Sequence, residues 1–279
     1  MNRFMLRIRM GLGLRNFKGA DLSGLDLTGL DLRHCNLRGA NLRGAVLSQA
    51  NLEGMDLTGT NLSGADLRSA NLAEAAFERA NLQEANLAGA VLRRADLRRQ
   101  NLRGANLFGA NLTGANLSDS RLIGVDLRRA QLPEATLWGT NLDRANLLQA
   151  DLSQASLDGA SLHGANLNRA QLTGAALCEA NLKEAKLWDA ELSDIKLGGA
   201  KLDGIRLDVT QLPSRIAAKF KVAKKARARS QSNNQQSHSQ EASQPNQQHS
   251  ERDQALPSQP NAQPNQQPNG QAQAQEQSR

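Results

Sequence analysis

From Phe17 to Leu212 a bulky apolar residue returns at every fifth position without interruption, and it is Leu everywhere except at Phe17 and Phe77. A small residue, usually Ala, stands two positions earlier, and Asn or Asp usually stands one position earlier. Gly is frequent two positions later, as in the unit Ala105-Asn106-Leu107-Phe108-Gly109. The apolar pattern therefore defines a five-residue repeat that covers most of the chain.

A period of five matches neither a helix, which needs apolar returns near 3.6 residues, nor a flat strand, which needs a period of two. Each unit is instead predicted to be a short extended piece followed by a tight turn. The Leu and the small residue then point inward and the other three side chains point outward. Gly after the Leu suits a turn position with positive φ. Such units bury their apolar side chains by winding into a solenoid of stacked coils.

The repeat resembles that of the pentapeptide repeat proteins. The resemblance implies an all-β fold, a right-handed quadrilateral β-helix with four units in each coil, so that residues twenty apart stack on one another. On this interpretation residues 16–213 form a pentapeptide-repeat solenoid of about ten coils, with Leu columns inside and Ala at the corners.

The segments at either end are interpreted as caps, because a solenoid end exposes unpaired backbone and core Leu. Residues 1–15 alternate apolar and other residues, which predicts a capping segment in the form of a strand or a partial coil. The alternative is a basic, apolar segment that rests on an anionic membrane. Residues 214–229 change to a helical spacing, with Ile216, Phe220 and Ala223 on one side, and predict a short capping helix.

The outer side of that helix forms a candidate basic patch, which would be either a solvated cap face or a site for nucleic acid or lipid phosphates. Residues 230–279 are rich in Gln, Asn, Ser and Pro and are predicted to be disordered. The basic patch consists of Lys219, Lys221, Lys224, Lys225, Arg227 and Arg229.

Charge separates the ends from the repeat. The chain carries a net charge of +7, yet residues 16–214 hold 21 basic and 23 acidic side chains, so the positive charge lies at the ends. Only two cysteines are present, Cys35 at an inward and Cys178 at an outward position. A disulfide between them is not expected, since they lie seven coils apart, and we expect a cytoplasmic protein. No apolar run reaches the roughly 18 residues of a membrane span, and no secretory signal is expected in the arginine-containing N-terminus.

No catalytic, cofactor-binding or metal-ligating constellation is found in the sequence. The four His lack ligand spacing with Cys or with one another. The carboxylates alternate with Asn at a structural position of the repeat, so they do not indicate acid–base chemistry. The prediction is a non-enzymatic protein without cofactors or metals.

The predicted function is that of a protein–protein interaction scaffold or adaptor. Its partner would be an unidentified protein or a second copy of the chain in a homodimer. The candidate partner patch consists of large apolar residues at outward positions: Phe108, Ile123, Trp138, Leu148 and Trp188. The resemblance also implies an alternative, because some pentapeptide repeat proteins mimic DNA and bind type II topoisomerases. The near-neutral repeat lacks the acidic ladder that this role requires, and a third alternative is phosphate or membrane binding through the basic ends.

A cluster of arginines lies at the middle of the repeat and admits a phosphate-binding interpretation. Stacking by twenty residues, however, places Glu74 beside Arg94, Glu78 beside Arg98 and Asp119 beside Arg99. Cross-strand pairs of this kind are expected to make the cluster mostly structural. The cluster consists of Arg93, Arg94, Arg98, Arg99 and Arg103.

Overall fold

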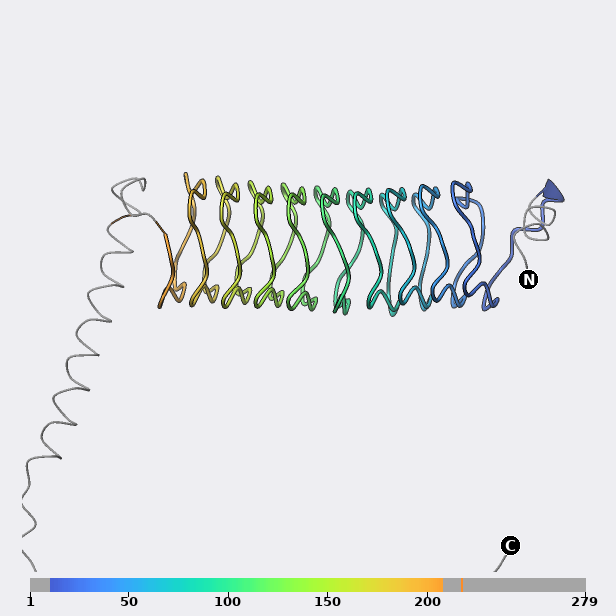
Figure 1. Ribbon diagram of the computed structural model, residues 1–279, viewed down its shortest axis with the longest axis horizontal. Helices are drawn as coiled ribbons and strands as arrows, with labels where there is room; N and C mark the ends of the chain where they lie inside the picture. Colours follow the sequence, from blue (N-terminus) through green and yellow to red (C-terminus); the bar gives the residue numbers. More distant parts are fainter. Residues whose placement is uncertain (1–10, 208–216, 218–279) are drawn as a thin grey trace, which may run out of the picture. The chain divides into compact units, whose positions relative to one another are not determined.

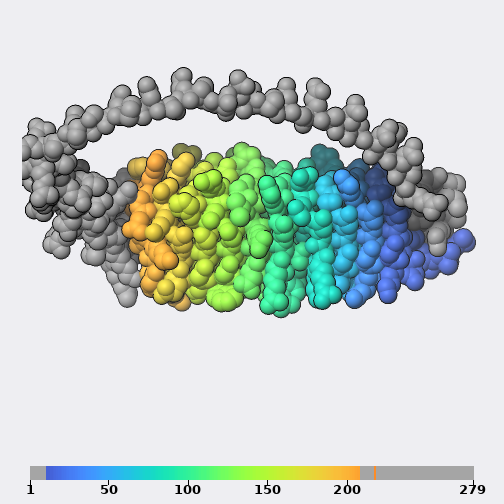
Figure 2. Space-filling view, turned by 90° about the horizontal axis from the view of Figure 1, so that it is seen from below, coloured from blue at the N-terminus to red at the C-terminus, as the bar shows by residue number. Residues whose placement is uncertain are grey.

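A right-handed β-helix is formed by the repeat (Figure 1). The computed structural model describes residues 11–207 and Ala217. In the space-filling view each coil appears as a band in contact with the next (Figure 2). The predicted fold class, an all-β quadrilateral solenoid, is confirmed.

Parallel bridges between residues twenty apart set the register, from Asn16 with Asn36 to Lys186 with Arg206. Each coil contributes four such bridges at most, one per face, and within residues 11–207 none extends into a longer strand. We number the faces 1 to 4 in chain order, beginning at Phe17, Leu22, Leu27 and Leu32, and each face recurs every twenty residues. Side chains at equivalent positions therefore form columns along the solenoid axis.

The interior holds the Leu columns and the small corner residues. Every central residue from Phe17 to Leu197 is buried, whereas Leu202 and Leu207 near the end of the described segment are half-buried. Most of the corner Ala residues are fully buried as well, as are Thr60, Ser120 and Thr140 at equivalent corners. The predicted division into two inward and three outward residues per unit is confirmed.

Each unit turns through a backbone hydrogen bond from the small residue to the central Leu three positions earlier, as in Ala40 N–H to Leu37 O at 2.9 Å. The residue directly before the small residue, Gly39 in this example, has positive φ, as in a type II turn. Gly fills this position in many units, but within residues 11–207 eighteen non-glycine residues also adopt it, among them Arg144 and Glu184. The winding of the coil therefore imposes the turn even where the side chain disfavours it.

The preference for Asn or Asp before each Leu has a hydrogen-bonding cause. The side-chain oxygen accepts the backbone N–H two residues later, as in Phe108 N–H to Asn106 Oδ1 at 3.0 Å. This Asx turn positions the residue after the Leu. Where two Asn stack, the amide of one also donates to the other, as from Asn166 to Asn146 at 3.1 Å.

The ends differ in part from the sequence-based expectation. Gly11 is helical, Leu12 and Gly13 form a turn, and the side chains of Leu12 and Leu14 are exposed. Residues 11–15 do not form the predicted strand, because Gly13 takes a positive φ of 76° that interrupts an extended chain. The bond from Asn36 N–H to Arg15 O at 2.8 Å agrees with the other predicted form, a partial coil, and the capping role stays a prediction. Residues 1–10 lie outside the described residues. At the other end Ala217 is helical and buried; the rest of the predicted helix 214–229 and the predicted disordered segment 230–279 also lie outside them.

Candidate functional site

The predicted partner patch is distributed over three faces. Phe108, Leu148 and Trp188 lie in the outward column of face 3, whereas Ile123 lies on face 2 and Trp138 on face 1. Trp138 is 55% exposed, Ile123 and Trp188 are each 48% exposed, and Phe108 is 37% exposed. Leu148 is half-buried. The repeat therefore places large apolar side chains on its surface without using them in the core.

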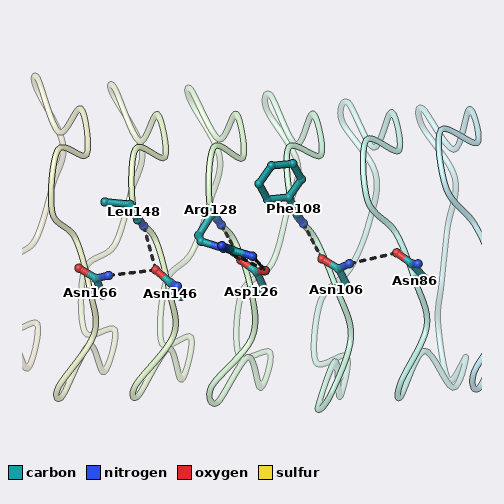
Figure 3. Close-up of polar contacts among 8 residues, drawn as sticks. All are labelled: Asn86, Asn106, Phe108, Asp126, Arg128, Asn146, Leu148 and Asn166. Atoms are coloured by element: carbon teal, nitrogen blue, oxygen red, sulfur yellow. Dashed lines mark hydrogen bonds and ion pairs between the residues drawn. The ribbon is translucent and has the colours of Figure 1, made fainter.

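Arg128 separates Phe108 from Leu148 along face 3 (Figure 3). Its guanidinium carbon lies 5.4 Å from the centroid of the Phe108 ring. The same guanidinium forms a fork on Asp126, with Nε 2.9 Å from Oδ1 and Nη2 2.7 Å from Oδ2. The face 3 column is therefore an apolar side chain, a neutralised arginine and a second apolar side chain, and not a continuous apolar strip.

The arrangement of Asp126 and Arg128 recurs wherever the repeat reads Asp-Leu-Arg. In each case the carboxylate accepts both the backbone N–H and the guanidinium of the arginine two residues later. Hydrogen bonding from Arg33 lowers the pKa of Asp31 from 3.8 to about 2. Equivalent bonds lower the pKa of the other three carboxyls. The four pairs are Asp31–Arg33, Asp66–Arg68, Asp96–Arg98 and Asp126–Arg128.

These forks correct part of the predicted charge stacking in the arginine cluster. Arg98 pairs with Asp96 of its own unit at 2.6 Å, and not with Glu78. Arg99 and Asp119 approach to 4.0 Å, as expected, but Arg94 forms no ion pair with Glu74. For Arg98 the reason is the Asx turn, which already holds the Asp96 carboxylate beside it.

A groove of about 790 Å³ runs along face 1. Small outward side chains, Thr58, Ala76 and Ser118, alternate along it with longer ones. Its charged side chains are largely paired with one another: Arg38 with Asp56, Arg98 with Asp96, and Arg99 with Asp119. Trp138 also lines this groove. Face 1 therefore combines a hollow, paired charges and one exposed indole.

Metal ligands, reactive cysteines and membrane-spanning helices would each indicate a function of another kind in residues 11–207. That segment contains no group of three or more His, Cys, Asp or Glu side chains able to hold a metal ion. Both cysteines are free, and burial raises the pKa of the Cys35 thiol. No described helix has the length and apolarity needed to cross a membrane. The candidate basic patch, Lys219 to Arg229, lies outside the described residues.

Comparison with known proteins identifies the repeat. The family model for pentapeptide repeats matches in eight copies that together span residues 16–183. No curated protein gives a significant match. Among solved structures, HetL from the cyanobacterium Nostoc sp. strain PCC 7120, described as involved in heterocyst differentiation regulation, is 37% identical. The match covers 74% of this chain and 94% of HetL, with a TM-score of 0.60.

Two further solved structures share the repeat. Rfr23 from the cyanobacterium Cyanothece 51142 is 32% identical, with 40% of this chain and 64% of that chain covered and a TM-score of 0.29. QnrB1, a plasmid-mediated fluoroquinolone resistance protein, is 20% identical, with 71% and 87% covered and a TM-score of 0.43. The family match and the identity to HetL agree with the Leu, Ala and Asn columns described above. The chain belongs to the pentapeptide repeat family.

Proposed function

We propose that this protein is a non-catalytic scaffold or adaptor of the cytoplasm that binds a protein partner through the outward side chains of face 3. The observation that carries the proposal is the exposure of Phe108 and Trp188 in one column, together with Leu148 between them. Aromatic residues and arginine are enriched at the centres of protein interfaces. Arg128, held by Asp126, lies between the first two apolar side chains and supplies that second component.

The rigidity of the solenoid supports this role. The backbone of residues 16–207 is hydrogen-bonded from coil to coil along almost its whole length, so the spacing of the exposed side chains is set before a partner binds. A preorganised surface loses little conformational entropy on association. The relative HetL is described as taking part in a regulatory process, and regulation through protein contacts is the role that we propose here.

The proposal is tested by a triple variant, Phe108→Ser, Leu148→Ser and Trp188→Ser, in the full chain. None of the three is a core position, so circular dichroism and the unfolding midpoint should match those of the parent. Affinity capture from the native host and size-exclusion chromatography with light scattering should show loss of a complex or of an oligomer. The matched control replaces three outward residues of face 4 by Ala, and this variant should keep every interaction. The three residues are Thr113, Ser153 and Thr173. A triple Ser variant that retains all partners of the parent would refute the proposal.

The competing proposal is a DNA mimic that acts on a type II topoisomerase. Such a surface requires exposed negative charge, whereas four of the carboxylates in this solenoid each form an ion pair with an arginine of the same unit. Purified protein is therefore expected neither to inhibit supercoiling by DNA gyrase nor to protect gyrase from a quinolone. Inhibition or protection at micromolar protein would favour the mimic over the scaffold.

A further inference from the structure

One corner of the solenoid carries a residue that is too long for its position. Gln100 occupies an inward corner where the coils on either side have Ala80 and Ser120. It is 5% exposed. Its Nε2 donates to the carbonyl of Arg98 at 3.3 Å, while its Oε1 is buried and has no hydrogen-bond partner. A buried amide oxygen without a partner is unfavourable, because it has given up its hydrogen bonds to water.

Hydrogen bonds between coils are missing beside Gln100. One coil earlier, the corresponding backbone N–H groups bond normally: Gly59 to Glu78 O at 2.8 Å, Leu62 to Asn81 O at 2.8 Å and Asn81 to Thr60 O at 2.9 Å. In the next coil the equivalent N–H groups belong to Arg79, Leu82 and Asn101. None of these three forms a hydrogen bond, and the bridge expected between Asn81 and Asn101 is absent.

The side chain of Gln100 explains the loss. Its amide takes the Arg98 carbonyl, which is the acceptor that the N–H of Arg79 would use in the regular pattern. Asn101 directly follows Gln100, and its carbonyl is the acceptor that Leu82 N–H would use in the regular pattern. Phe77, which replaces Leu in the central column, lies just before this corner. The hydrogen bond from Phe77 N–H to Asp96 O is 3.1 Å long, whereas the equivalent bond one coil later, from Leu97 N–H to Asn116 O, is 2.8 Å long.

A second corner with a long side chain also lacks hydrogen bonds between coils. Met55 stands at an inward corner above Cys35, and the bridge between Asn36 and Asp56 is also absent, with the N–H groups of Leu37 and Asp56 unbonded. By contrast, the short side chain of Thr60 bonds to its own turn at Leu57 O, and Asn61 N–H keeps its bond to the preceding coil. Bulk alone does not cause the loss, because beside the corner residues Ile195 and Ile205 the bonds from Lys196 N–H to Ala175 O at 3.0 Å and from Arg206 N–H to Ala185 O at 2.9 Å are kept.

We propose that the interface between Arg79–Leu82 and Arg98–Asn101 is a built-in seam, at which the solenoid opens while the coils on either side stay hydrogen-bonded. Solenoid stability is a sum of interfaces between neighbouring coils, so one weakened interface opens independently of the others. The seam also has a place in the surface. The face 1 groove crosses it, with Arg38, Thr58 and Glu78 before it and Arg98, Ser118 and Trp138 after it. Opening of the seam changes the spacing between these two parts of the groove.

Amide hydrogen exchange of the full chain, followed residue by residue by NMR, tests the seam. In the parent, the amides of Arg79, Leu82 and Asn101 should exchange at least about ten-fold faster than those of Gly59, Leu62 and Asn81. Gln100→Ala installs the residue found at Ala40 and Ala160 in the same column, and should slow the three amides to the rate of their counterparts. Gln100→Thr, which copies Thr60, should do the same.

Two matched variants separate the seam from a general change in stability. Met55→Ala should slow exchange at Leu37 and Asp56 and leave Arg79, Leu82 and Asn101 fast. Thr60→Ala removes an inward corner hydroxyl and should not slow exchange at the seam or at the amides beside Met55. Equal protection of the two sets of amides in the parent would overturn the proposal. So would fast exchange at Leu82 and Asn101 that persists in both Gln100 variants.

Discussion

The guanidinium carbon of Arg128 lies 5.4 Å from the ring centroid of Phe108, one coil away on the same face. This contact predicts a ring-current effect: the Hδ and Hε resonances of Arg128 should shift upfield in NMR spectra. Phe108→Leu should return them to ordinary positions. Arg98 is the matched control, because it forms the same fork on Asp96 but follows Glu78 in its column. Equal shifts for Arg98 and Arg128 would contradict the contact.

Acid should destabilise the solenoid in a defined range of pH. The folded-state pKa of Asp31 is about 2, below its ordinary value of 3.8. A depressed carboxyl pKa contributes stability that is fully present above the unfolded-state value and is lost as the pH falls through the folded-state value. We therefore expect the free energy of unfolding, measured with urea, to fall between about pH 4 and pH 2.

The arginine of that pair can be tested separately. Arg33→Gln removes the fork, so the pKa of Asp31, followed by NMR, should rise back toward 3.8. Arg43→Gln is the control, because Arg43 follows Asn41 and not an aspartate. If Arg43→Gln raised the pKa of Asp31 as much as Arg33→Gln, long-range charge and not the local fork would be the cause.

The Leu columns should dominate stability. Leu112 is fully buried near the middle of the solenoid, so Leu112→Ala should cost about 2–5 kcal/mol through lost contacts and a residual cavity. The adjacent Thr113 points outward and is half-buried, and Thr113→Ala should change stability by less than about 0.5 kcal/mol. Thermal and urea unfolding followed by circular dichroism measure both. Similar losses from the two changes would mean that the core is assigned incorrectly.

The turn geometry predicts different tolerance at the equivalent turn positions of two neighbouring units. Gly124 has a φ of 66° with open space where a Cβ would lie, so Gly124→Ala meets only the left-handed backbone penalty, about 1–2 kcal/mol. Arg129 occupies the same place in the next unit with a φ of 57°, and Arg129→Ala should leave stability almost unchanged. Urea unfolding compares the two. A neutral Gly124→Ala would show that this turn can rearrange.

Most of the fold could be predicted from the sequence because burial is periodic. A residue that returns every fifth position, such as Leu107 or Leu112, reports its inward direction without any knowledge of its neighbours. The outward position of Phe108 and Trp188 follows from the same count. The choice of Asp96 over Glu78 by Arg98 does not, because both carboxylates lie within reach of the arginine and the choice depends on side-chain geometry. The Asp-Leu-Arg triplet, read as an Asx turn, was the signal that would have identified the pair.

The covering of Phe108 by Arg128 and the seam at Gln100 were also not predicted. Stacking by twenty residues makes Arg128 a neighbour of Phe108, but it does not say whether the guanidinium leans over the ring or away from it. At Gln100 the signal was present, because a long polar residue stands in a column whose other corner residues are Ala, Ser or Thr. Its effect on three backbone hydrogen bonds depends on which carbonyl the amide reaches, and only the structure shows that carbonyl to be that of Arg98.

The uninterrupted register of the coils has a consequence for changes in chain length. Four units complete one circuit, so removal of one five-residue unit rotates everything that follows by a quarter turn, whereas removal of twenty residues restores every column. Loss of a single unit between Phe108 and Trp188 would keep the core pattern intact and yet move Trp188 from face 3 to face 2. Length variants of this protein can therefore fold equally well and yet differ in which outward residues lie on the same face. The number of five-residue units between two outward residues thus sets both their distance along the axis and the angle between them.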